Sequence, residues 1–193
     1  MASIDEIIGY YQETGNFMKT AAKFKMNKRI LHLTLAKARV LKINDKIDYG
    51  STNVRFGGLA EKKFSEIFPE AISINDYWVR NHPDYDFNLK KLRIDVKYSS
   101  IHIKKKKKKT GNEEWTAHGN RTKHKQENPV DFFVIFLERE KGSKLDNPHI
   151  LAIPGGMAKS EIHISKSGMF FNEFRMKDES ELREYLLAYA DLV

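Results

Sequence analysis

The first part of the chain carries apolar residues at helical spacing. Ser3 stands where an N-cap residue would, and Glu6 follows three positions later, which is the sequence pattern of a capping box. The apolar period predicts one helix over residues 4–13, a second over 17–24 and a third over 28–41. We therefore expect the chain to begin with three helices.

A polar run then interrupts the helical pattern. Residues 44–54 are mostly polar and contain a single glycine, a composition typical of a linker. Beyond it, helical spacing resumes until Pro69 ends the next predicted helix. This organisation predicts a helical domain at residues 1–43, a linker at 44–54 and a second domain at 55–193.

The second domain mixes strand and helix patterns. Residues 85–89 and 92–99 predict two short strands joined by a tight turn, because apolar and polar positions alternate there. Residues 130–138 are almost entirely apolar, as expected of a central strand covered on both faces, and 149–154 predict its neighbour. Helical spacing returns from residue 178 onward. The order of elements predicts a mixed α/β (α+β) fold.

Composition excludes several classes of protein. The 193 residues are 40% hydrophobic and 31% charged, a balance typical of a soluble globular protein. The chain has no cysteine, which excludes disulfides, a thiol nucleophile and a thiolate zinc site. It has no run of roughly 18 apolar residues and no signal-peptide pattern at its start. We expect a cytoplasmic protein with no membrane partner.

The positive charge is concentrated in one stretch. The net charge is +8, and residues Lys97–Lys125 hold ten basic and two acidic side chains, which equals the whole surplus. Six consecutive lysines, Lys104–Lys109, cannot be buried in a core and are either solvated or bound to phosphate. A polyanionic partner fits this pattern, although a solvated loop would give it too.

The predicted second and third helices resemble a known DNA-binding motif. The run GNFMKTAAKFKMNKRILHLTLAKARV is similar to a helix-turn-helix, with Ala21 or Ala22 as the small residue at the close approach of the helices. A helical hairpin packed only for stability is the alternative. The resemblance implies a third helix in the major groove of DNA. The expected DNA contacts are Lys28, Arg29 and His32 at bases or phosphates, and Lys19 and Lys23 at the backbone.

The alternation of residues 92–99 has a chemical consequence. Asp95 and Lys97 lie two positions apart, so their side chains point to the same face of the predicted strand, opposite Ile94 and Val96. The bland interpretation is an ordinary solvent-facing pair. A chemical interpretation becomes attractive because the acidic residues Asp84 and Asp86 precede the same hairpin.

This hairpin resembles the active site of a nuclease superfamily. The run HPDYDFNLKKLRIDVKYSS, preceded by a helix bearing Glu61, is similar to that of the PD-(D/E)XK nucleases, which include restriction endonucleases, Holliday-junction resolvases and some homing endonucleases. The resemblance covers roughly residues 56–155 and implies a restriction-endonuclease-like αβββαβ core. Asp86 is preferred to Asp84 as the first acid because it directly precedes the strand FNL.

The resemblance also implies roles for these residues. Asp86, Asp95, the main-chain carbonyl of Val96 and Glu61 are expected at a Mg²⁺ ion, which Mn²⁺ could replace. Hard oxygen ligands of this kind suit Mg²⁺, and such an ion polarises a phosphate and lowers the pKa of a bound water. Lys97 would orient the water and offset the charge that develops on the phosphate.

The lysine run is expected at the rim of the DNA cleft. Lys104, Lys105 and Lys106 are the predicted phosphate contacts there, because each such contact releases a counterion from DNA. Relatives of the superfamily carry basic or Gln residues on a later helix, which makes Lys123 and Gln126 further candidates by resemblance.

Together these features predict a Mg²⁺-dependent endodeoxyribonuclease that acts on double-stranded DNA. A site-specific enzyme of homing or restriction type is favoured, because a separate reading helix is predicted. The alternatives are a structure-selective Holliday-junction resolvase or repair nuclease, and a catalytically inactive DNA-binding regulator. Cutting both strands favours a homodimer on DNA, for which the C-terminal helix offers an apolar face, unless that face packs on its own sheet.

Overall fold

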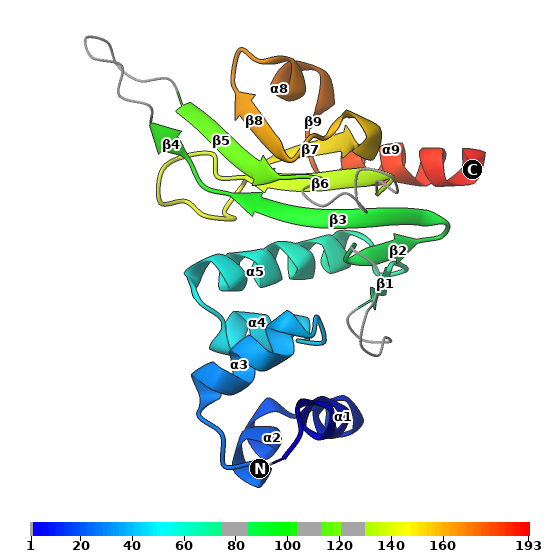
Figure 1. The fold of residues 1–193 in the computed structure, drawn as a ribbon. Coiled ribbons are helices and arrows are strands. Elements are labelled where there is room, and N and C mark those ends of the chain that lie inside the picture. The colour runs from blue at the N-terminus through cyan, green and yellow to red at the C-terminus, as the bar shows by residue number, and fades with distance from the viewer. Residues whose placement is uncertain (1, 75–84, 104–112, 121–129) are drawn as a thin grey trace. The chain divides into compact units, whose positions relative to one another are not determined.

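The computed structural model describes residues 2–74, 85–103, 113–120 and 130–193. The chain folds into two compact units. Met1–Leu59 and Ser73–Pro83 form the first unit, and Ala60–Ile72 and Asp84–Val193 form the second. Figure 1 shows the elements in chain order, from the blue N-terminal helices to the red C-terminal helix. None of the helices in the described ranges is long and apolar enough to cross a membrane.

The first unit is helical. Its elements are α1 (Ile4–Thr14), α2 (Phe17–Lys23), α3 (Lys28–Lys37), α4 (Ile43–Tyr49) and the first half of α5 (Thr52–Ile67). The three helices predicted at the start of the chain are confirmed. Residues 44–54, predicted as a linker, contain most of α4 and the start of α5, and the predicted domain boundaries stay predictions.

Local side-chain bonds begin and end these helices. The predicted capping box is present, since the Glu6 amide donates to the Ser3 hydroxyl at 3.2 Å and the Ser3 amide donates to the Glu6 carboxylate at 2.7 Å. α3 ends at Lys37 and not at residue 41 as predicted. Arg39 adopts a left-handed conformation with φ 56° and Val40 donates back to the Leu35 carbonyl at 3.1 Å, which is the termination known as a Schellman motif.

The core of the first unit explains why α4 forms in a polar segment. Tyr11 is fully buried, and its hydroxyl donates to the Asp45 carboxylate of α4 and accepts the Lys42 amide at 3.1 Å. Tyr49, also on α4, stacks on Phe17 with ring centroids 4.2 Å apart. Of the two candidate small residues between helices, Ala21 is buried and Ala22 is exposed.

A mixed six-stranded sheet has the order β1-β2-β3-β6-β7-β9, and all of its strands apart from Ser73 of β1 belong to the second unit. β3 pairs in parallel with β6, and the other registered pairs of this sheet are antiparallel. The strands are β1 (Ile72–Ser73), β2 (Phe87–Leu89), β3 (Leu92–Ser99), β6 (Phe132–Leu137), β7 (His149–Pro154) and β9 (Arg175–Met176). The prediction of a mixed α/β fold is confirmed, with β6 as a fully buried central strand.

A smaller sheet and the remaining helices complete this unit. The smaller sheet has the antiparallel order β4-β5-β8. Its strands are β4 (His102–Ile103), β5 (Glu113–His118) and β8 (Glu161–Ser165), and the helices are η1 (Gly155–Met157), α8 (Met169–Phe174) and α9 (Glu179–Leu192). The helix expected near residues 123–126 lies outside the described residues.

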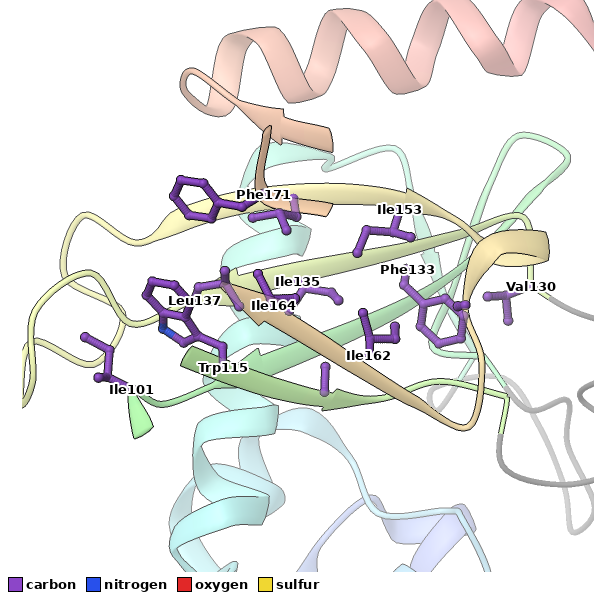
Figure 2. Packing of buried hydrophobic residues seen from close by; sticks show 13 residues of the cluster. Ile101, Trp115, Val130, Phe133, Ile135, Leu137, Ile153, Ile162, Ile164 and Phe171 are labelled. Carbon is purple, nitrogen blue, oxygen red and sulfur yellow. The ribbon is translucent and has the colours of Figure 1, made fainter. Parts of the chain in front are cut away.

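The large sheet is covered on both faces. On one face, Phe64 of α5 lies 4.9 Å from Phe87, and Tyr189 of α9 lies 4.8 Å from Phe132, measured between ring centroids. On the other face, alternate residues of β6 pack against the smaller sheet, and Figure 2 shows Phe133 and Ile135 in this cluster with Trp115. Continuous burial of β6 therefore follows from its central position.

The apolar face of α9 is used within its own unit. Leu182 and Leu186 are completely buried, and Arg183 anchors the helix by donating to the Ile67 carbonyl at 2.6 Å. These two leucines therefore stabilise the second unit rather than offer a dimer contact. The homodimer on DNA stays a prediction. Leu182 and Leu186 are no longer part of its expected interface.

Candidate active site

A tight hairpin positions the candidate catalytic residues. β2 and β3 are antiparallel, with Phe87 opposite Ile94 and Leu89 opposite Leu92. The two residues between them form the turn, in which Lys90 takes a left-handed conformation with φ 54°. The predicted hairpin is confirmed, and its register brings the residue before β2 alongside the middle of β3.

Asp86 is fastened to β3 on both sides of Asp95. The Asp86 amide donates to the Ile94 carbonyl at 2.9 Å, and the Asp86 carboxylate oxygen Oδ2 accepts the Val96 amide at 2.8 Å. A side-chain oxygen thus takes the place that a strand carbonyl would hold in a regular ladder. Asp86, which directly precedes β2, is thereby held beside β3 at the level of Asp95.

Asp95 is a buried acid paired with a partly exposed cation. Its side chain is 2% exposed and accepts a hydrogen bond from the Lys97 ammonium, whose side chain is 29% exposed. An ionised carboxylate is rarely buried unless it is paired, because it loses its hydration. The pair is therefore not the ordinary solvent-facing pair of an exposed strand.

The surroundings of Lys97 are strongly acidic. Burial alone would lower the pKa of the Lys97 ammonium, but the negative charges of Asp95 and Asp86, the hydrogen bond to Asp95 and the charge of Glu61 raise that pKa above its ordinary value. Three carboxylates thus act on one ammonium. Among the residues that the structure describes, the charges that shift the Lys97 pKa are all negative.

A second ion pair holds β3 in place beside this site. Asp131, the residue before β6, accepts the Arg93 amide at 2.7 Å and the Arg93 guanidinium at 3.2 Å. Arg93 lies two positions before Asp95 and so shares its strand face. Because the parallel register pairs Asp95 with Phe133, this face is turned toward the smaller sheet. The sequence analysis did not predict the ion pair between Arg93 and Asp131. The signal for it was an aspartate, Asp131, directly before an apolar strand.

The donor set fits a magnesium ion that keeps most of its water. In the described part of the chain, no three His, Asp or Glu side chains lie close enough together to hold a metal ion. Mg²⁺ does not require three ligating side chains, because it usually binds through one or two carboxylates and takes its other oxygens from water and phosphate. Asp86, Asp95 and the Val96 carbonyl carry oxygen donors of the kind that such an ion takes. Glu61, buried on α5, acts on the site through its charge.

The predicted DNA-binding residues divide into three groups. Lys19 and Lys23 of α2 and Lys28 and Arg29 of α3 are exposed, as a phosphate contact requires. His32, by contrast, is buried. The other candidates, together with Asp84, lie outside the described residues: Lys104, Lys105, Lys106, Lys123 and Gln126.

His32 does not face solvent. It lies on the inner face of α3 with Leu31 and Leu35, and burial lowers the pKa of its imidazole. A buried ring offers no accessible nitrogen to a phosphate or to a base edge. The DNA contact predicted for His32 is therefore wrong. The exposed positions of α3 include the large aliphatic residues Ile30 and Leu33.

Comparison with known proteins gives a limited result. No protein-family model matches the chain, and no curated protein matches it. Among solved structures, a bacterial homing endonuclease, I-Ssp6803I, aligns with 18% sequence identity and a TM-score of 0.42. The alignment covers 74% of this chain and 95% of that chain. The function proposed below rests on this chain's own residues.

Proposed function

We propose that this chain is a Mg²⁺-dependent endonuclease that hydrolyses phosphodiester bonds of double-stranded DNA. The observation that supports the proposal is the burial of Asp95 with Lys97, beside an Asp86 carboxylate fixed to the same strand. Perturbed, paired ionisable groups of this kind cluster at functional sites. A purely structural role would not require a second carboxylate and the charge of Glu61 at the same ammonium.

The roles of the residues follow from their chemistry. Asp86, Asp95 and the Val96 carbonyl would hold the ion, and the charge of Glu61 would add to its attraction. When bound, Mg²⁺ polarises the phosphate and makes water a better nucleophile at neutral pH. Lys97, held charged by its surroundings, orients the attacking water and stabilises the negative charge that develops on the phosphate. The water oxygen forms a new bond to phosphorus and releases a proton to solvent, while the bond to the leaving oxygen breaks and that oxygen takes up a proton from solvent.

We propose that the first unit directs the enzyme to DNA as a helix-turn-helix. Support comes from the charge of residues 17–42, which contain eight basic side chains and no acidic one. Exposed Lys28 and Arg29 stand at the beginning of α3, the end of a reading helix that approaches base edges in this motif. Such a module favours a site-specific enzyme over one that recognises only the shape of a junction.

A cleavage assay with matched variants tests this proposal. Purified protein is expected to cut duplex DNA with Mg²⁺ or Mn²⁺ and to stop in excess chelator. Asp95→Asn keeps the shape of the side chain and removes its charge, and Lys141→Ala removes an exposed charge from another part of the chain. The proposal requires loss of cutting in the first variant and full cutting in the second. Equal cutting by both variants would contradict it.

A further inference from the structure

The outward face of α3 is apolar, although the helix is otherwise basic. Ile30 and Leu33 are 56% and 58% exposed. They lie three residues apart and Lys37 follows four residues later, so the three side chains share one face of the helix. Leu31, His32 and Leu35 occupy the opposite, buried face. The two large aliphatic side chains therefore project away from the core of the first unit.

The exposure of Ile30 and Leu33 calls for an explanation, because polar residues would be equally compatible with a solvent-facing helix position. Burying an isoleucine or leucine side chain contributes about 1.5–3 kcal/mol relative to leaving it in water. The adjoining outward positions carry Arg29 and Lys37, which are exposed, and polar residues would suit positions 30 and 33 equally well in a helix that meets only solvent. An apolar pair bordered by cations fits a partner that is itself both anionic and locally apolar.

The major groove of DNA offers this combination. Its rims are phosphates, and its floor carries the C5-methyl group of thymine, which is a site for apolar contact with side chains. An acidic protein surface would satisfy the cations too, but the absence of any acidic residue across 17–42 matches a partner with negative charge on both sides of the helix. The charge pattern thus favours duplex DNA as the occupant of this face.

We propose that Ile30 and Leu33 are specificity-determining residues that contact thymine methyl groups. This inference rests on the proposed function and deepens it, because it names the base that α3 selects. Arg29 and Lys37 hold the helix against the phosphates. The two aliphatic side chains strengthen binding to A·T pairs because they bury the methyl groups of thymine. The preferred site of the enzyme is therefore rich in thymine where α3 enters the groove.

The test compares thymine with deoxyuridine, which lacks only the methyl group. Full-length protein is bound in EDTA, without cleavage, to a pool of random duplexes made with thymine and to a matched pool made with deoxyuridine. Selection from the thymine pool is expected to enrich A·T pairs. The selected sites, resynthesised with deoxyuridine, should bind about fourfold more weakly for each methyl group that α3 no longer covers.

Two variants separate methyl contact from general binding. Ile30→Ser with Leu33→Ser should bind the thymine and deoxyuridine forms of the selected site equally, whereas Ile4→Ser, which alters an exposed isoleucine of α1, should keep the difference. Circular dichroism checks that all variants remain helical. Ile30→Val with Leu33→Val, which keeps an apolar surface, should retain part of the discrimination and guards against misfolding of the serine variant.

Each other outcome overturns the inference. Equal binding of both DNA forms by the wild-type protein would contradict the methyl contact while leaving the nuclease proposal intact. If wild-type protein self-associates in light scattering, the serine variant does not, and neither discriminates the two DNAs, the face binds a second copy. No binding to either pool would overturn this inference, and no cutting in the separate Mg²⁺ assay would overturn the proposed function.

Discussion

The carboxylate of Asp86 accepts the backbone amide of Val96 at 2.8 Å. This bond joins the residue before β2 to the strand that carries Asp95 and Lys97, and it gives Asp86 a structural role besides the metal-binding role that we propose for it. The two roles predict different effects for different substitutions at one position.

Substitutions at Asp86 should separate stability from cleavage. Asp86→Asn keeps an oxygen that can accept the Val96 amide and should unfold at nearly the wild-type denaturant concentration, yet cut poorly because the charge is removed. Asp86→Ala leaves that amide without its acceptor and should lose about 1–3 kcal/mol of unfolding free energy as well. Urea unfolding and plasmid cleavage measure the two effects. Equal stability of both variants would show that the bond contributes nothing.

Removing one member of the Asp95–Lys97 pair should destabilise the protein more than removing both charges. Lys97→Ala removes the ammonium that pairs with a buried carboxylate, a change that costs roughly 3–5 kcal/mol in fully buried pairs. A smaller loss is expected here because Lys97 is partly exposed. The double variant Asp95→Asn with Lys97→Met should regain stability but not cleavage. Double-mutant analysis of urea unfolding checks this, and additive losses would contradict the coupling.

Acid should destabilise the second unit through His149. Burial, followed by the positive charges of Arg139, Arg175 and Lys166, lowers the pKa of His149 to about 4. An unfolded histidine titrates near 6.5, so below that pH the unfolded chain binds a proton that the folded chain resists. Stability is thus complete above about pH 6.5 and falls as the pH drops toward 4.

A variant isolates this contribution. His149→Phe keeps an aromatic ring against Trp115 and Phe171 but cannot be protonated. Thermal unfolding followed across this pH range should show a shallower fall in Tm for His149→Phe than for the wild-type protein. Parallel curves would mean that His149 titrates normally in the folded state.

Basic residues of α3 should govern the salt dependence of DNA binding. Replacing Lys28 and Arg29 by alanine is expected to reduce the slope of log K against log salt by about 1 for each phosphate that is no longer neutralised. Lys141→Ala serves as the control, because this exposed lysine lies on the loop between β6 and β7. Binding titrations at several salt concentrations measure the slopes. An unchanged slope in the double variant would show that Lys28 and Arg29 of α3 do not contact DNA phosphates.

Local signals made much of the fold predictable from the sequence. Ser3 and Glu6 marked the first helix because a capping box depends only on neighbouring residues, and the alternation around Asp95 marked β3. α4 was not predictable, since its helix is supported by the contact of Asp45 with Tyr11, which lies 34 positions away. Tertiary contacts of this kind override a polar composition.

The sequence indicated which residue types would form the candidate site, but it did not indicate how far each side chain is buried. The resemblance to the nuclease hairpin pointed to Asp86, Asp95 and Lys97, and the structure joins Asp86 to Val96 and Lys97 to Asp95 through hydrogen bonds. The sequence could not show that Asp95 is buried, because its strand pairs with β6, whose residues Phe132–Leu137 come much later in the chain. The sequence also did not show that His32 is buried and that Ile30 is exposed, for a related reason. An apolar period as wide as that of α3 does not fix which side faces the core.

The central claim is that this chain hydrolyses DNA at the Asp86–Asp95–Lys97 site with a divalent cation. The most direct measurement is digestion of mixed plasmid and phage DNA by the wild-type protein and by folded Asp95→Asn, each with Mg²⁺ and with excess EDTA. The account predicts discrete cuts only for wild-type protein with Mg²⁺. Undiminished cutting in EDTA or by Asp95→Asn, or no cutting under any condition, would contradict it.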